Sequence, residues 1–227
     1  MIPKFKAALF DMDGTLLCTM RYWRFTTLEV LLAHDIIPTA EQLAQMYSTS
    51  SRRLCMQILA ERGLELDQKD VIREMEGYMH RHYLHDAHAK PRVGEYLAKL
   101  RRAGIPMCVA TGSPREYARD GLARQGLAQH FEFITDGYEF GMDKHDPAFF
   151  RLMAEKLGVE TGEMCVFEDA LYSIKSAKEA GCPVMAILDP AYQHDWEEIK
   201  ALSDYWFTDY GELLQTADKA RKRKNAE

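Results

Sequence analysis

Two aspartates, two residues apart, close a short apolar run near the start of the chain. Asp11 and Asp13 follow this run and flank Met12, and Gly14 comes next. An apolar run stopped by a turn residue predicts a buried strand, and side chains two apart on a strand share a face. Carboxylates about 4 Å apart repel by about 4 kcal/mol at an effective dielectric constant of about 20. A hard divalent cation, most simply Mg²⁺, relieves this repulsion; the alternative is a pair of solvated acids in a turn.

Polar side chains also follow two later apolar runs. Thr111 comes directly after one run, and Glu168 and Asp169 come directly after another. Ligands of open parallel sheets bind beyond the carboxyl ends of the strands. If these runs are parallel strands, their polar residues gather with Asp11 and Asp13 at one edge of the sheet.

Predicted strands and helices alternate along most of the chain, and these elements must position the polar residues. The predicted strands are the run ending at residue 10 and the segments 105–110, 131–134, 164–167, 183–188 and 205–208. From residue 91 onward, helical segments separate them, which predicts right-handed strand-helix-strand units and a parallel sheet. Helical periodicity alone marks 21–33, 40–47, 51–61 and 68–85. We therefore predict an α/β core domain from residues 1–17 and 87–227, interrupted by an all-helical cap domain at 18–86.

The composition is ordinary for a globular protein. The chain has 227 residues, 47% hydrophobic and 28% charged, which suits one large domain or a core with an insertion. Its net charge of −6 gives no support to binding of nucleic acid or of an anionic membrane. No apolar run approaches the roughly 18 residues of a membrane span, and five scattered cysteines favour reduced thiols. We expect a cytoplasmic protein and, by default, a monomer.

Four ordered motifs resemble those of the haloacid dehalogenase-like hydrolases. They are Asp11-Met12-Asp13-Gly14-Thr15, Val109-Ala110-Thr111-Gly112-Ser113, Lys144 within segment 143–147, and Phe167-Glu168-Asp169. The match covers nearly all of the chain outside the predicted cap. The cap resembles the helical type inserted after the first motif, in the branch that includes phosphoglycolate phosphatase and β-phosphoglucomutase. The resemblance implies a Rossmann-like core and phosphoryl transfer.

The resemblance also implies roles for the acids and for one lysine. Asp11 is the expected nucleophile, which forms an aspartyl-phosphate. Asp13 is the expected acid and base, which protonates the leaving oxygen and then activates water. Lys144 is expected to pair with both the phosphate and Asp11, unless it is a solvated loop lysine. A halide leaves without a proton, whereas an alkoxide leaving group needs one. Asp13 therefore favours phosphate esters over carbon–halogen bonds as the substrate.

The same resemblance implies a cofactor site and a phosphate site. Mg²⁺ is expected on the Asp11 side chain, the Asp13 backbone carbonyl and Asp169, with Glu168 as a second or water-mediated ligand. The alternative for Glu168 and Asp169 is helix capping, and Thr111 has the same alternative. The groups expected to hold phosphate oxygens are Thr111 and the backbone N–H groups of Met12, Gly112 and Ser113.

The chain departs from the family pattern near two of these motifs. His145 replaces the proline of the usual Gly-Lys-Pro, either as loop filling or as a phosphate or substrate contact. Ala170 and Ser173 replace a serine and a glycine in the usual Glu-Asp-Ser-x-x-Gly-Ile. These changes affect the fine geometry of the site and leave the reaction class unchanged.

The predicted cap carries the information on substrate. Arg52 resembles a cap arginine that contacts a second phosphate in mutases; its alternative is a solvated arginine at a helix N-terminus. Cys18 and Trp23 stand where that branch often has an acid and a histidine, which disfavours a mutase. The sequence thus predicts a Mg²⁺-dependent phosphatase of a small phosphorylated metabolite, such as a sugar phosphate, phosphoglycolate or a nucleotide-like monoester. The alternatives are a β-phosphoglucomutase-like hexose-phosphate mutase and a binding protein without turnover.

Overall fold

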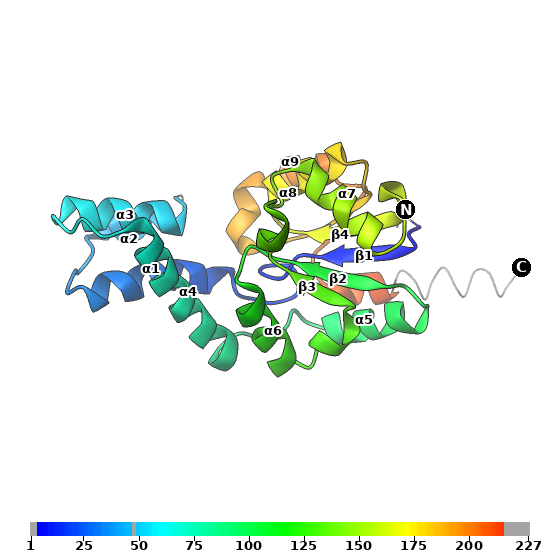
Figure 1. Cartoon of the computed structure of the whole chain (residues 1–227), viewed down its shortest axis with the longest axis horizontal. Coiled ribbons are helices and arrows are strands. Elements are labelled where there is room, and N and C mark those ends of the chain that lie inside the picture. Colours follow the sequence, from blue (N-terminus) through cyan, green and yellow to red (C-terminus); the bar gives the residue numbers. More distant parts are fainter. Residues whose placement is uncertain (1–3, 47–48, 216–227) are drawn as a thin grey trace, which may run out of the picture. The chain divides into compact units, whose positions relative to one another are not determined.

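The chain divides into two compact units in the computed structural model, which describes residues 4–46 and 49–215 (Figure 1). One unit runs to Cys18 and resumes at His88, and the other unit spans Thr19–Ala87. No helix in the described part of the chain combines the length and the apolar character needed to cross a bilayer.

The first unit is built on a six-stranded sheet in which every pair of neighbouring strands is parallel. The strands are β1 (Ala7–Phe10), β2 (Met107–Ala110), β3 (Phe133–Thr135), β4 (Met164–Glu168), β5 (Val184–Ile187) and β6 (Tyr205–Phe207). Their order is β3-β2-β1-β4-β5-β6, which places β1 between β2 and β4. The predicted parallel α/β fold is confirmed.

Helices cover both faces of this sheet. All residues of β1, β2, β4 and β5 are buried, as expected for strands covered on two sides. Figure 1 shows α7, α8 and α9 on one side of the strands and α5 and α6 on the other. These helices are α5 (Val93–Arg102), α6 (Arg115–Arg124), α7 (Pro147–Lys156), α8 (Leu171–Glu179) and α9 (Trp196–Leu202).

Alternate strand residues form two apolar layers. Leu9, Cys108 and Val166 pack with Phe150 of α7 and other apolar residues of α7–α9. On the other face, the ring of Phe10 stacks on a phenylalanine of β4 with centroids 4.2 Å apart. A strand period of two residues thus lets each short strand serve both layers.

The second unit contains four α-helices in its described residues: α1 (Met20–Ala33), α2 (Ala40–Gln45), α3 (Ser51–Glu61) and α4 (Gln68–His85). Thr39 and Gln42 form a capping box at the start of α2. Apolar side chains of α1, α3 and α4 share one buried cluster. The predicted end of the second helix, Tyr47, lies outside the described residues.

Short helical turns complete the first unit. They are η1 (Ala128–His130), η2 (Tyr138–Phe140), η3 (Thr161–Glu163) and η4 (Pro190–Asp195). The sequence did not predict these turns or α9. α9 has only 7 residues, which is shorter than the window over which helical periodicity is recognised.

Candidate active site

The ends of β1 and β4 bring three carboxylates together. The Asp11 N–H donates to the carbonyl oxygen of Phe167 at 2.9 Å, which continues the ladder between the two strands. Carboxylate oxygens of Asp11, Glu168 and Asp169 all lie within 4.8 Å of one another. The convergence of these acids at one sheet edge follows from the position of β1 beside β4.

A tight turn after β1 places the Asp13 carboxylate beside the second motif. Gly14 adopts φ +90°, and the N–H groups of Leu16 and Leu17 both donate to the Met12 carbonyl at 2.9 Å. The Asp13 carboxylate accepts a hydrogen bond from the Ser113 hydroxyl at 3.0 Å, measured from Oγ to Oδ2. This hydrogen bond therefore joins the first motif to the second.

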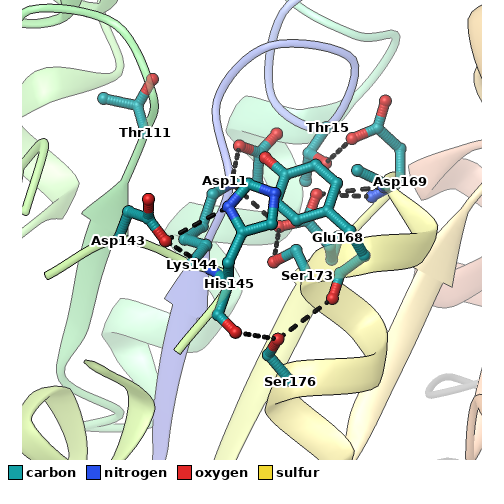
Figure 2. Close-up of polar contacts among 12 residues, drawn as sticks. Asp11, Thr15, Thr111, Asp143, Lys144, His145, Glu168, Asp169, Ser173 and Ser176 are labelled. Carbon is teal, nitrogen blue, oxygen red and sulfur yellow. Dashed lines mark hydrogen bonds and ion pairs between the residues drawn. The ribbon is translucent and has the colours of Figure 1, made fainter. Parts of the chain in front are cut away.

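Lys144 enters the site from the loop before α7. Asp146 caps that helix by accepting from the Ala148 N–H at 2.8 Å, and Pro147 occupies the first turn. The Lys144 Nζ lies 2.5 Å from Asp11 Oδ1 and 3.0 Å from Glu168 Oε2, as drawn in Figure 2. The buried ammonium group therefore bridges two of the three acids.

Burial and mutual repulsion control protonation of the acids. Burial, followed by the charge of Glu168, raises the pKa of Asp11 from 3.8 to about 8, although Lys144 opposes this shift. Burial and the neighbouring acids also raise the pKa of Asp169 well above its usual value. For Lys144, burial lowers the pKa, but Asp11 and Glu168 outweigh it, so the net shift is upward and the lysine stays charged.

The donor set fits a divalent cation with oxygen ligands. When all three carboxyl groups are ionised, the single ammonium group leaves two negative charges uncompensated. Asp11 Oδ2 and Asp169 Oδ2 are buried and lack a hydrogen-bond partner within the described part of the chain. Unpaired buried oxygens are costly, and a hard divalent cation would satisfy both. Thr15 orients Asp169 through a hydrogen bond from Oγ1 to Oδ1 of 3.3 Å.

The second motif folds back on itself. The Ser113 N–H donates to Thr111 Oγ1 at 3.1 Å, and its contact with phosphate stays a prediction. The N-cap of α6 is Pro114, so the alternative role of Thr111 as a helix cap does not apply to that helix. Gly112 is exposed and has open space around it, because nothing lies within 4 Å of a Cβ built there.

The substituted positions next to the motifs make contacts that the sequence did not predict. The His145 ring stacks on Tyr172 with centroids 4.2 Å apart, and its carbonyl accepts from the Ser176 hydroxyl at 2.9 Å. The Ser173 hydroxyl donates to Glu168 Oε2 at 2.7 Å. In the sequence, Ser173 stands out only as a departure from the glycine of the family pattern; a buried polar residue in the first turn of α8 is the feature that indicates this contact.

Arg52 lies in the second unit, near the start of α3. Its guanidinium is 3.4 Å from Glu76 Oε1 and its Cζ is 5.8 Å from the centroid of the Trp23 ring. Met12, another predicted substrate contact, is in the first unit, where it follows Asp11 in the sequence and its side chain is fully buried.

Comparison with known proteins identifies the family. The model of the haloacid dehalogenase-like hydrolases matches residues 5–181. The chain belongs to the haloacid dehalogenase-like hydrolases. The resemblance carried by the four motifs is therefore confirmed.

Curated relatives of this hydrolase share most of its length. N-acetylmuramic acid 6-phosphate phosphatase of Pseudomonas aeruginosa is 29% identical over 187 residues, covering 81% of this chain and 82% of the relative. Fructose-1-phosphate phosphatase of Escherichia coli is 28% identical over 181 residues, covering 80% and 95%. Both are phosphatases, which confirms the predicted enzyme class.

Solved structures support the fold. The crystal structure of CbbY from Rhodobacter sphaeroides in complex with phosphate superposes with a TM-score of 0.76 at 23% identity. The similarity covers 92% of this chain and 96% of that chain.

Proposed function

We propose that this hydrolase is a Mg²⁺-dependent phosphatase that removes phosphate from a small phosphorylated sugar or a related metabolite. The observation that carries the proposal is the buried group of Asp11, Lys144 and Asp169, in which two carboxylate oxygens lack a partner within the described residues. The substrate class is taken from the two relatives, which are named for phosphorylated sugars.

The cation would be held by the side chains of Asp11 and Asp169 and by the backbone carbonyl of Asp13. When bound, it supplies positive charge that offsets the repulsion between an anionic nucleophile and a phosphate dianion. The Lys144 ammonium group supplies a second, fixed positive charge 2.5 Å from the nucleophile.

Asp11 attacks phosphorus through a carboxylate oxygen, the ester oxygen departs, and an aspartyl-phosphate forms. Asp13 donates a proton to that departing oxygen. It then takes a proton from the water that cleaves the acyl phosphate, so the carboxyl returns to its starting state. The hydroxyl of Ser113 orients Asp13 for both transfers. Thr111 and the N–H groups of Met12 and Gly112 would contact phosphate oxygens.

The proposal is tested by measuring phosphate release from a panel of sugar phosphates, phosphoglycolate and nucleotides, with Mg²⁺ and with a chelator. We expect release only with Mg²⁺, and Asp11→Asn should abolish it while circular dichroism stays unchanged. The control is Asp70→Asn, which removes an exposed carboxylate from α4 and should leave turnover unchanged. Undiminished turnover by Asp11→Asn would exclude the proposed nucleophile. Conversion of β-glucose 1-phosphate to the 6-phosphate, without free phosphate, would identify a mutase instead.

A further inference from the structure

Glu168 has no lone pair left for a metal ion. Its Oε1 accepts hydrogen bonds from the N–H groups of Asp169 and Ala170, each at 3.1 Å. Its Oε2 accepts from Lys144 Nζ at 3.0 Å and from the Ser173 hydroxyl at 2.7 Å. A carboxylate offers about four lone-pair positions, so the protein itself uses all of them. Glu168 is also fully buried, which excludes exchange of these donors for solvent.

Unlike Glu168, the other two acids of the cluster each have one carboxylate oxygen that accepts no hydrogen bond from the described residues. Asp11 Oδ2 and Asp169 Oδ2 are buried without a hydrogen-bond partner among the described residues. A cation can bind these two oxygens without breaking any hydrogen bond. To reach Glu168 directly, it would have to displace an ammonium group, a hydroxyl or a backbone N–H group.

Ser173 completes this arrangement. It lies in the first turn of α8, is fully buried, and directs its hydroxyl back to the end of β4 (Figure 2). The glycine of the usual family pattern has no hydroxyl, so the bond to Glu168 is a property of this chain. Without it, Glu168 Oε2 would be held by Lys144 alone and would have one lone pair available.

We propose that Ser173 is a positioning residue that fixes Glu168 as the anchor of Lys144 and leaves direct metal binding to the carboxylates of Asp11 and Asp169. Glu168 then holds the ammonium group 2.5 Å from the nucleophile instead of serving as the second metal ligand expected from the sequence. The metal-binding part of this inference is independent of the proposed reaction. Its kinetic part rests on the proposed phosphatase activity.

The metal-binding part is tested by calorimetric titration of the full-length chain with Mg²⁺. Asp169→Asn and Glu168→Gln each remove one negative charge from the same cluster, so their difference reports direct ligation. We expect Asp169→Asn to weaken Mg²⁺ binding at least about tenfold more than Glu168→Gln does. Equal losses in the two variants would overturn the proposal. If the wild type hydrolysed no ester, this titration would still show whether Asp169 or Glu168 binds the metal directly.

The kinetic part is tested with Ser173→Ala and Ser173→Gly. At saturating Mg²⁺ we expect kcat and kcat/KM to fall together by about tenfold, while the Mg²⁺ dissociation constant changes by less than about twofold. Ser203→Ala is the matched control, because that hydroxyl donates to the Ile199 carbonyl instead of a carboxylate. A role in packing alone predicts a lower melting temperature with unchanged kcat. Unchanged kcat in both variants, or Mg²⁺ affinity altered as strongly as in Asp169→Asn, would refute the proposal.

Discussion

Asp11 has two carboxylate oxygens in different surroundings. Its carboxylate is paired with Lys144 through Oδ1, while Oδ2 has no hydrogen-bond partner among the described residues. Burial and the charge of Glu168 raise its pKa to about 8. A group with this pKa holds a proton at neutral pH until a cation replaces it. Protonation and metal binding therefore compete for the same carboxyl group.

This competition predicts that Mg²⁺ affinity rises with pH. Because the pKa of Asp11 is raised from 3.8 to about 8, the proton is bound below pH 8 and must leave when the cation binds. Affinity should increase by about tenfold per pH unit for each proton displaced, over the pH range in which Asp11 and Asp169 lose their protons. The same shift makes the metal-free protein lose stability as the pH rises from about 4 to about 8.

Calorimetry at pH 6, 7, 8 and 9, in two buffers of different ionisation enthalpy, measures both the affinity and the protons released. In Asp11→Asn, binding should be weaker and its pH dependence smaller. A constant dissociation constant between pH 6 and pH 8 would contradict the proposed competition.

At the scale of elements, a buried ion pair ties the segment after the helical insertion to the loop that follows β5. The Lys90 N–H donates to the Leu16 carbonyl at 2.8 Å, and its Nζ donates to Asp189 Oδ2 at 2.8 Å. The two side chains are only 9% and 7% exposed. Asp189 Oδ1 also accepts from the Ala191 N–H at 3.0 Å, at the start of η4.

Breaking this pair should destabilise the protein strongly. Lys90→Met leaves a buried charge on Asp189 and should lower the free energy of unfolding by about 3–5 kcal/mol. The double variant Lys90→Met/Asp189→Asn removes both charges and keeps an acceptor for η4, so it should recover at least half of this loss. Urea denaturation measures both effects. Lys175→Met, which breaks the half-exposed pair with Glu198, is the control and should cost at most about 1 kcal/mol. A cost this small for Lys90→Met would refute the prediction.

At the scale of the whole molecule, the helical insertion leaves and re-enters the first unit at neighbouring backbone positions. The Cys18 N–H donates to the His88 carbonyl at 2.8 Å, and Leu17 and Ala89 form an antiparallel bridge. Each unit also has a buried apolar cluster of its own. A short connection can therefore replace the insertion without stretching the sheet.

Replacing residues 19–87 with a short Gly/Ser linker should leave a folded core. Mg²⁺ at about 100 times its dissociation constant should stabilise this core by about 2.7 kcal/mol. Hydrolysis of acetyl phosphate should persist while discrimination among sugar phosphates falls, because the insertion is the expected source of specificity. Calorimetric melting and phosphate release measure these outcomes, and Asp169→Asn in the same core should remove the stabilisation by Mg²⁺. A core without a cooperative melting transition would show that the units depend on each other for folding.

The sequence alone predicted the strands, the parallel sheet and the residues at the strand ends. Apolar runs, turn residues and helical periodicity are local features that a window of about ten residues contains. Asp11 and Asp169 were placed correctly at strand ends for this reason. α9 was missed because its 7 residues are fewer than such a window needs to show helical periodicity.

Only the tertiary structure decided how hydrogen bonds are shared among these residues. The strand order, with β1 beside β4, brings Asp11 to Glu168, which are far apart in the sequence. The Ser173 hydroxyl lies 2.7 Å from Glu168 Oε2, and the Ser113 hydroxyl donates at 3.0 Å to Asp13, which is far away in the sequence. Such pairings depend on which donors arrive within hydrogen-bond distance after the chain has folded, and no local pattern specifies them.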